Sequence, residues 1–91
     1  MNKDMEVTIT IKYLVNLADI SGRQKEEVCF PEGSTLHDVV RYLKETRSIT
    51  LPDPRIMTVL NGLGWNQHQD AWDTSLTDGD TVLLFPPLSG G

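Results

Sequence analysis

The chain has 91 residues, of which 38% are hydrophobic and 23% are charged. This length allows one small domain, and folding of so short a chain buries only somewhat more than about 60% of its unfolded surface. The composition is typical of globular chains and excludes disorder as a description of the whole sequence. The modest core argues against a self-contained enzyme with a deep cleft, and it leaves a carrier or a subunit of an assembly open.

The charge of the chain is unevenly distributed. Eight Lys and Arg residues against 13 Asp and Glu residues give a formal net charge of −5. Arg55 is the last Lys or Arg, and the residues that follow it include Asp70, Asp73, Asp78 and Asp80. Phosphate backbones attract the opposite charge, so nucleic acid is a poor partner for this chain. A basic groove on another protein fits the charge better.

Cysteine, histidine and the apolar runs set further limits. Cys29 is the only cysteine, so it forms no disulfide within the chain and no Cys₄ metal site, and we expect it to be a small buried hydrophobe. His37 and His68 lack the spacing of metal ligands, so we expect both at the surface and no metal bound. No apolar run approaches the roughly 20 residues of a membrane span. Residues 1–6 are too polar for a secretion signal, which favours a cytoplasmic protein away from the membrane.

The first half of the chain predicts two strands and one helix. Apolar residues alternate with polar ones over 7–13, which is typical of a half-buried strand, and a second strand is predicted over 25–30. Thr35 is placed to begin a helix, with Asp38 available to the free amides of the first turn. The apolar residues at 36, 39, 40 and 43 define one helical stripe, and we expect the helix to end near Arg47.

The second half predicts two more strands around an irregular segment. Residues 57–60 form a short strand followed by the turn pair Asn61-Gly62. Residues 64–74 are irregular, and the sequence leaves the role of this loop open. One or both of Trp65 and Trp72 are expected to close the edge of the core, with contact to a partner as the less favoured alternative. Residues 81–85 are the most apolar run of the chain, which predicts a strand covered on both faces and placed centrally beside the first strand.

This order of elements predicts an α+β domain of the β-grasp type over residues 1–85. Four to five strands form a mixed sheet that packs on one main helix. Because one helix covers only one face of a small sheet, we expect an exposed apolar patch on the other face, leading to Leu88. Residues 86–91 are expected to form a flexible tail.

The C-terminal residues carry the clearest functional signal. Pro86 and Pro87 favour an extended polyproline conformation that leads the chain away from the domain. Gly90 and Gly91 have no side chains, so they form either a frayed end or a backbone slim enough to enter a narrow channel on another protein. The proline pair, the reach of the tail and its slim end together favour the second interpretation.

The segment Leu76–Gly91 resembles the ending of the MoaD/ThiS sulfur-carrier family. Its Phe85-Pro86-Pro87 run is most similar to the MoaD branch, the small subunit of molybdopterin synthase. Weaker similarity extends to Gly33–Leu36, which resembles the start of the family's helix, and to Val59–Gly62, which resembles its third strand and turn. The resemblance implies a ubiquitin-like fold and a carrier that is not an enzyme by itself.

The resemblance also implies a chemistry and a set of partners. An E1-like activating enzyme would use ATP to adenylate the carboxylate of Gly91, and a sulfur donor protein would convert it to a thiocarboxylate. The large subunit of molybdopterin synthase would then receive the sulfur, with Gly90 threading its channel. Phe85, Pro86, Pro87 and Leu88 would bind the partners, and the carrier would hold no cofactor of its own.

Two other functions remain open at this stage. A ubiquitin-like protein modifier would use the same activated Gly91 but transfer it to lysine amines of target proteins. A ubiquitin-fold interaction module would bind partners without using the tail chemically. The sequence also leaves open which pathway is served, among molybdopterin, thiamine, tRNA thiolation and protein modification, and whether molybdenum or tungsten is the final metal.

Overall fold

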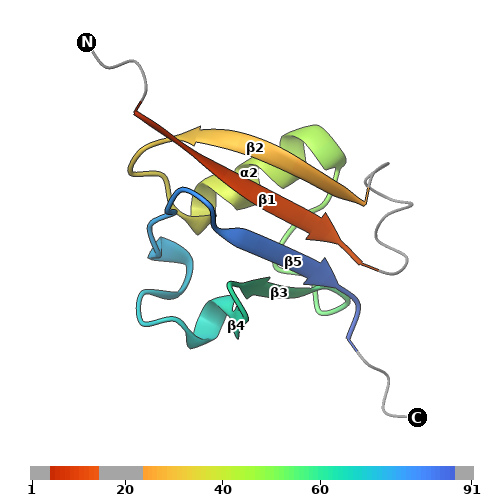
Figure 1. The fold of residues 1–91 in the computed structure, drawn as a ribbon. Coiled ribbons are helices and arrows are strands. Elements are labelled where there is room, and N and C mark those ends of the chain that lie inside the picture. The colour runs from red at the N-terminus through yellow and green to blue at the C-terminus, as the bar shows by residue number, and fades with distance from the viewer. Residues whose placement is uncertain (1–4, 15–23, 88–91) are drawn as a thin grey trace.

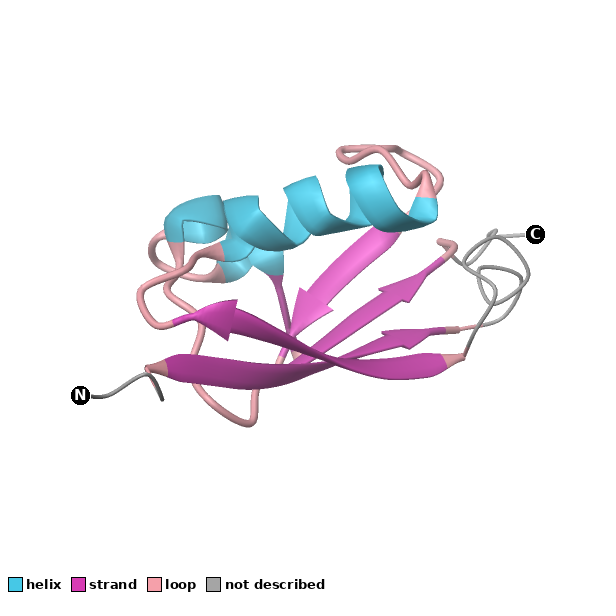
Figure 2. Ribbon diagram, turned by 90° about the horizontal axis from the view of Figure 1, so that it is seen from above, coloured by secondary structure: helices cyan, strands magenta, loops and turns pink. Residues whose placement is uncertain are grey.

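The described fold is a mixed β-sheet with one α-helix lying across one of its faces (Figure 1, Figure 2). The computed structural model describes residues 5–14 and 24–87. In this part of the chain the sheet has five strands in the order β2-β1-β5-β3-β4. The predicted α+β class, with a mixed sheet on one main helix, is therefore confirmed.

The strands and the helix have nearly the bounds that the sequence predicts. The differences lie in the segment expected to be irregular, which contains a two-residue strand and two short 3₁₀ helices. The elements are β1 (Glu6–Tyr13), β2 (Lys25–Pro31), α2 (Leu36–Arg47), β3 (Met57–Leu60), β4 (Leu63–Gly64), η1 (Trp65–Gln67), η2 (Ala71–Asp73) and β5 (Thr81–Phe85).

β1 and β5 are parallel neighbours at the centre of the sheet. Ile11 of β1 is in register with Val82 of β5, whereas β2 and β3 run antiparallel to the central pair on either side. The prediction that the last strand lies beside the first is confirmed. Because β1 and β5 run in the same direction, both strands end at the same edge of the sheet.

The hydrophobic core lies between the sheet and α2. Every second residue of β1, from Val7 to Tyr13, is buried, and Val82 and Leu84 of β5 are 0% exposed. Strand alternation thus supplies one continuous apolar face, and α2 covers it with the stripe predicted from its sequence. The buried apolar side chains are Val7, Ile9, Ile11, Tyr13, Phe30, Leu36, Val39, Leu43, Ile49, Leu51, Leu60, Trp65, Leu76, Val82 and Leu84.

Both ends of α2 are fixed by local backbone chemistry. The hydroxyl of Thr35 accepts a hydrogen bond from the backbone N–H of His37 at 3.2 Å, and the Asp38 carboxylate accepts one from the N–H of Thr35 at 2.9 Å. This reciprocal cap stabilises a helix by about 1 kcal/mol. The helix ends at Arg47, after which Ser48 adopts a left-handed backbone conformation. The predicted start and end are confirmed.

The expectation that Cys29 is buried is wrong. Cys29 is exposed, and its partner in the β1–β2 register is Thr8, whose Oγ1 lies 3.4 Å from the Cys29 Sγ. Phe30, the next residue, is buried on the helix side. Since successive side chains of a strand alternate between faces, the burial of Phe30 places Cys29 on the face opposite the helix.

β5 is covered fully on one face only, contrary to the prediction from its continuous apolar run. Val82 and Leu84 are completely buried under α2, whereas Leu83 and Phe85 are only half-buried. Figure 2 shows the reason: among the described elements, no helix lies on the second face of the sheet. The separate expectation that one helix leaves the other face open is confirmed.

A buried carboxylate joins β1, β2 and α2. Glu26 accepts hydrogen bonds from the Tyr13 hydroxyl at 2.6 Å, the Tyr42 hydroxyl at 2.8 Å and the Arg47 Nε at 3.0 Å. Burial by itself raises the pKa of Glu26, but the hydrogen bonds from Arg47, Tyr13 and Tyr42 outweigh it and lower the pKa to about 2. Burial and the bond to Glu26 in turn raise the pKa of Tyr13 above its ordinary value. At neutral pH Glu26 and Arg47 are therefore charged, and both tyrosines keep the protons that they donate to Glu26.

We predict that Glu26→Gln lowers the free energy of unfolding by about 3 kcal/mol at neutral pH, because Arg47 loses its buried counter-charge. The folded-state pKa of Glu26 is depressed, so the stability it contributes is complete above the ordinary value of 4.5 and is lost as the pH falls toward about 2. Urea unfolding at a series of pH values should show the two proteins converging in that range.

The exposed neighbour Glu27 provides the control for this measurement. It lies on the same strand and points to solvent, so Glu27→Gln should leave stability nearly unchanged. A difference between wild type and Glu26→Gln that stayed constant down to the acid limit would contradict the assigned ionisation.

Candidate docking face and C-terminal exit

The end of β5 carries the chain off the sheet next to the end of β1. The backbone N–H of Leu14 donates to the carbonyl of Leu84 at 2.9 Å, which holds the two central strands together almost to the last residue of β5. Pro86 and Pro87 follow Phe85 and donate no backbone hydrogen bond, so they cannot extend the ladder. In Figure 1 the chain leaves β5 in a direction that leads away from the sheet.

The start of β5 is fixed by a turn rich in side-chain bonds. Asp80 is buried and accepts hydrogen bonds from the Asn61 amide at 2.9 Å and from the Thr77 N–H at 2.7 Å. The Asn61 Oδ1 in turn accepts from the N–H of Thr81 at 2.9 Å. Gly79 adopts a positive φ of 91° in this turn, a conformation that glycine takes without a steric cost. The acidic turn therefore has a structural role: it sets the register of the strand that ends in the exit.

An apolar patch lies on the face of the sheet opposite α2. The register between β3 and β5 pairs Met57 with Phe85 and Val59 with Leu83, and these four side chains share the open face. Met57 is 44% exposed, and the other three are half-buried. We call these four residues the open-face patch. It ends at Phe85, the residue from which the chain leaves the sheet.

The structure brings only some of the predicted site residues into view. Phe85, Pro86 and Pro87 lie at the exit as expected, with Phe85 in the open-face patch. Leu88, Gly90 and Gly91 lie outside the described residues, so their predicted roles are untested. Sequence reasoning missed Met57 and Val59, since only the antiparallel β3–β5 register shows that they join the patch.

Each of the two histidines contacts a residue in another segment of the chain. The Nε2 of His68 lies 3.0 Å from the Leu60 carbonyl and 3.2 Å from the Leu63 carbonyl, so this nitrogen donates to the hairpin that they flank. His68 is half-buried and not simply at the surface as expected. His37 is exposed and lies 2.9 Å from the carboxylate of Asp73.

Within residues 5–14 and 24–87 there is no group of three or more His, Cys, Asp or Glu side chains arranged to hold a metal ion. None of the helices in this part of the chain has the length and apolar character that crossing a membrane requires.

The fold and the exit define a class of protein. A mixed sheet with parallel central strands, one helix across one face and a C-terminal segment leaving the central strand is the ubiquitin-like β-grasp. The chain matches the model of the ThiS family over residues 11–91, so it belongs to the ThiS family. The resemblance to MoaD/ThiS carriers, seen first in the C-terminal segment, is thereby confirmed.

Individual relatives agree with this assignment. The chain is 27% identical over 85 residues to the molybdopterin synthase sulfur carrier subunit of Escherichia coli K12, covering 91% of this chain and 99% of that protein. It is similar to the solved structure of a putative molybdopterin converting factor, subunit 1, from Pyrococcus furiosus, with 26% identity, a TM-score of 0.75 and coverage of 90% and 99% of the two chains. The small archaeal modifier protein 1 of Methanosarcina acetivorans shares the fold, with 22% identity, a TM-score of 0.73 and coverage of 94% and 98%.

The open-face patch should be dispensable for folding, because its most exposed member contributes little to the core. We predict that Met57→Ala changes the free energy of unfolding by less than about 0.5 kcal/mol. Leu60→Ala on the same strand removes a side chain that is 2% exposed and should cost about 2–5 kcal/mol. Urea unfolding of the two variants measures the contrast, and equal losses would show that the patch is part of the core.

Proposed function

We propose that the chain is a sulfur carrier that delivers sulfur from its C-terminal Gly91 to the formation of molybdopterin. The observation that carries this proposal is the placement of the exit: the central strand ends beside an exposed apolar patch, and two prolines lead the chain away from it. A partner that docks on the open-face patch would have the end of the tail within reach of that contact, at about 20 Å or less. The family match extends to Gly91 itself.

The proposed chemistry begins with a carboxylate, which is a poor electrophile when ionised. An E1-like activating enzyme uses ATP to convert the Gly91 carboxylate to an acyl adenylate, releasing pyrophosphate. A persulfide on a sulfur donor protein attacks the acyl carbon, and AMP leaves with the electron pair of the carbon–oxygen bond. A thiol then cleaves the remaining sulfur–sulfur bond and leaves the thiocarboxylate, whose sulfur is a nucleophile.

Catalysis is assigned to the partners, and positioning to this chain. The carrier supplies the reactive sulfur on a backbone without side chains, and Gly90 allows it to pass through a narrow channel. The large subunit of a molybdopterin synthase supplies the pocket in which the sulfur is transferred. In this proposal the carrier is not an enzyme, it binds no cofactor, and ATP is used by the activating enzyme.

Sulfur carriage is favoured over protein modification by the sequence relatives. The relatives that share 26–27% identity are described as a sulfur carrier subunit and a molybdopterin converting factor. The modifier structures share 22% identity or less, a level at which the likeness describes the fold alone.

Intact-mass spectrometry tests the proposed chemistry. The full chain is incubated with ATP, a purified activating enzyme, a persulfide donor and a thiol, and we predict a mass increase equal to the exchange of one oxygen for sulfur. Gly90→Val should fold normally and lose transfer in the presence of the large subunit, because a branched side chain does not fit a channel shaped for glycine. Branched peptides linked through Gly91 to lysines, without any thiocarboxylate, would contradict the proposal.

Docking kinetics test the role of the open-face patch. Phe85→Ala removes the exposed part of a large apolar side chain from the contact with the partner. We therefore predict that the complex with the large subunit dissociates about tenfold faster. Raising the salt concentration should instead slow association, since the acidic charge of this chain steers it toward a basic groove. Stopped-flow binding separates the two effects, and unchanged rates in both arms would show that the partner docks elsewhere.

A further inference from the structure

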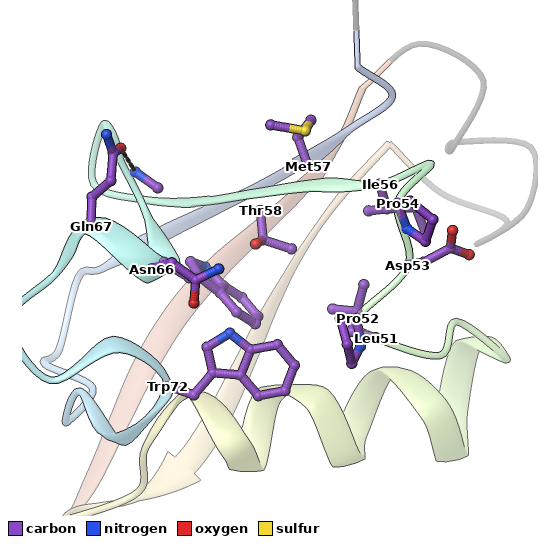
Figure 3. Close-up of a pocket in the computed structure, with 12 residues that line it drawn as sticks. Leu51, Pro52, Asp53, Pro54, Ile56, Met57, Thr58, Asn66, Gln67 and Trp72 are labelled. Carbon is purple, nitrogen blue, oxygen red and sulfur yellow. Dashed lines mark hydrogen bonds between the residues drawn. The ribbon is translucent and has the colours of Figure 1, made fainter.

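A cavity of about 630 Å³ opens at the β3 edge of the sheet, between that strand and α2 (Figure 3). Trp65 and Trp72 form one wall, and the loop from Leu51 to Pro54 forms the other. The cavity lies on the helix side of the sheet, so it is separate from the open-face patch. Met57, at the rim, borders both.

The aromatic wall is held in place by its own loop. The Trp65 and Trp72 rings pack edge to face with their centroids 5.8 Å apart, and Trp65 is only 1% exposed. Ala71 precedes Trp72 with a positive φ of 47°, a strained conformation for a residue with a Cβ. The Thr74 hydroxyl, donating to the Ala71 carbonyl at 2.6 Å, helps to fix this strained turn. Trp72 is therefore presented half-buried at the cavity, at a cost in backbone strain.

The polar groups of the cavity favour an uncharged part of a ligand that accepts hydrogen bonds. The Asp53 carboxylate is occupied by Arg55, whose Nε and guanidinium nitrogen lie 3.1 and 3.0 Å from its oxygens. The Gln67 carbonyl oxygen already accepts from the N–H of Gly64 at 2.9 Å, which leaves the amide donors of its side chain. The Trp65 Nε1 has no hydrogen-bond partner within the described part of the chain, but it is buried and does not reach the cavity surface. Aromatic faces beside the exposed Gln67 amide suit apolar side chains and backbone carbonyls.

The edge of β3 beside the cavity is open for half its length. β4 pairs only with Val59 and Leu60, so no described strand pairs with Met57 or Thr58 on that side. The N–H of Asn61 donates to the Thr81 carbonyl at 2.9 Å. In an antiparallel pair, the residues whose N–H and C=O bond to the neighbouring strand recur at every second position. Val59, two residues before Asn61, therefore bonds to β5, and the N–H and C=O of Thr58 point the other way, toward the cavity. An unpaired strand edge next to an aromatic cavity is the geometry that captures extended peptides.

We propose that this cavity binds an extended segment of a partner protein, which adds to the open half of β3 and places one apolar side chain between Trp72 and Pro52. The charge on the Trp72 side indicates basic residues beside that side chain, because Asp70 and Asp73 flank Trp72 in η2, whereas Arg55 near the opposite wall is paired with Asp53. This contact is a second binding site, independent of the chemistry at Gly91.

Peptides selected from a random phage-displayed library on the full chain provide the probe. We expect the selected peptides to carry an apolar residue flanked by Lys or Arg, and to shift the indole N–H signals of Trp65 and Trp72 in NMR spectra. N-methylation of the peptide residue whose N–H faces Thr58 should weaken binding by at least about tenfold, whereas methylation of the next residue should not. Equal effects at both positions would overturn strand addition.

Two variants complete the test. Trp72→Ala should weaken the selected peptides by at least about tenfold, whereas Phe85→Ala, a matched aromatic change in the open-face patch, should leave their affinity unchanged. If Trp72→Ala unfolds the chain, N-methylation of the peptide at the two successive positions, measured on the wild-type protein, still tests the proposal. Three outcomes would each overturn the proposal. They are binding of indole alone with no peptide selected, selection of peptides that shift Phe85 signals, and self-association of the chain through this edge.

Discussion

The parallel pairing of β1 with β5 is the interaction on which the rest of this fold depends. It joins the two strands that supply most of the sheet's buried apolar face, places Ile11 beside Val82 under the helix and leaves β2 and β3 as antiparallel flanks. A parallel pair needs cover for its buried face, and α2 provides it. The same pairing determines where the chain leaves the sheet, because a strand parallel to β1 has to end where β1 ends. Core formation and presentation of the tail are thus consequences of one register.

The two faces of the sheet have different chemistry because only one of them is closed. On the closed side even a carboxylate is accommodated, since Glu26 finds Tyr13, Tyr42 and Arg47 as partners. On the open side apolar side chains stay partly exposed beside threonines and a lysine, which is typical of a surface that binds another protein. The edge between the two faces carries the tryptophan cavity. A small domain thereby offers separate contacts without enlarging its core.

Much of this fold follows from local sequence patterns, and the exceptions depend on long-range pairing. Alternation over 7–13, the Thr35 cap and the Asn61-Gly62 turn each act within a few residues, so the sequence predicts them well. The exposure of Cys29 depends on which face of the sheet Phe30 occupies, and this is determined by the pairing of β2 with β1 and the packing of the sheet against α2. Membership of Met57 and Val59 in the patch depends on the β3–β5 register. The Glu26 cluster joins three elements: alternation with Val28 and Phe30 puts Glu26 on the inner face, but only the packing of β2 on α2 supplies Tyr42 and Arg47 as its partners.

The central pairing also affects how the chain folds as it is made. Thr10 and Thr81 are partners in the register although they lie near opposite ends of the sequence, and contacts of such long separation slow folding. Synthesis proceeds from the N-terminus, so the inner face of β1 stays without its central partner until β5 has left the ribosome. A chain cut short before β5 would expose Ile9 and Ile11 and be open to proteolysis. The domain is therefore completed only in chains that have been synthesised as far as the strand leading into the tail.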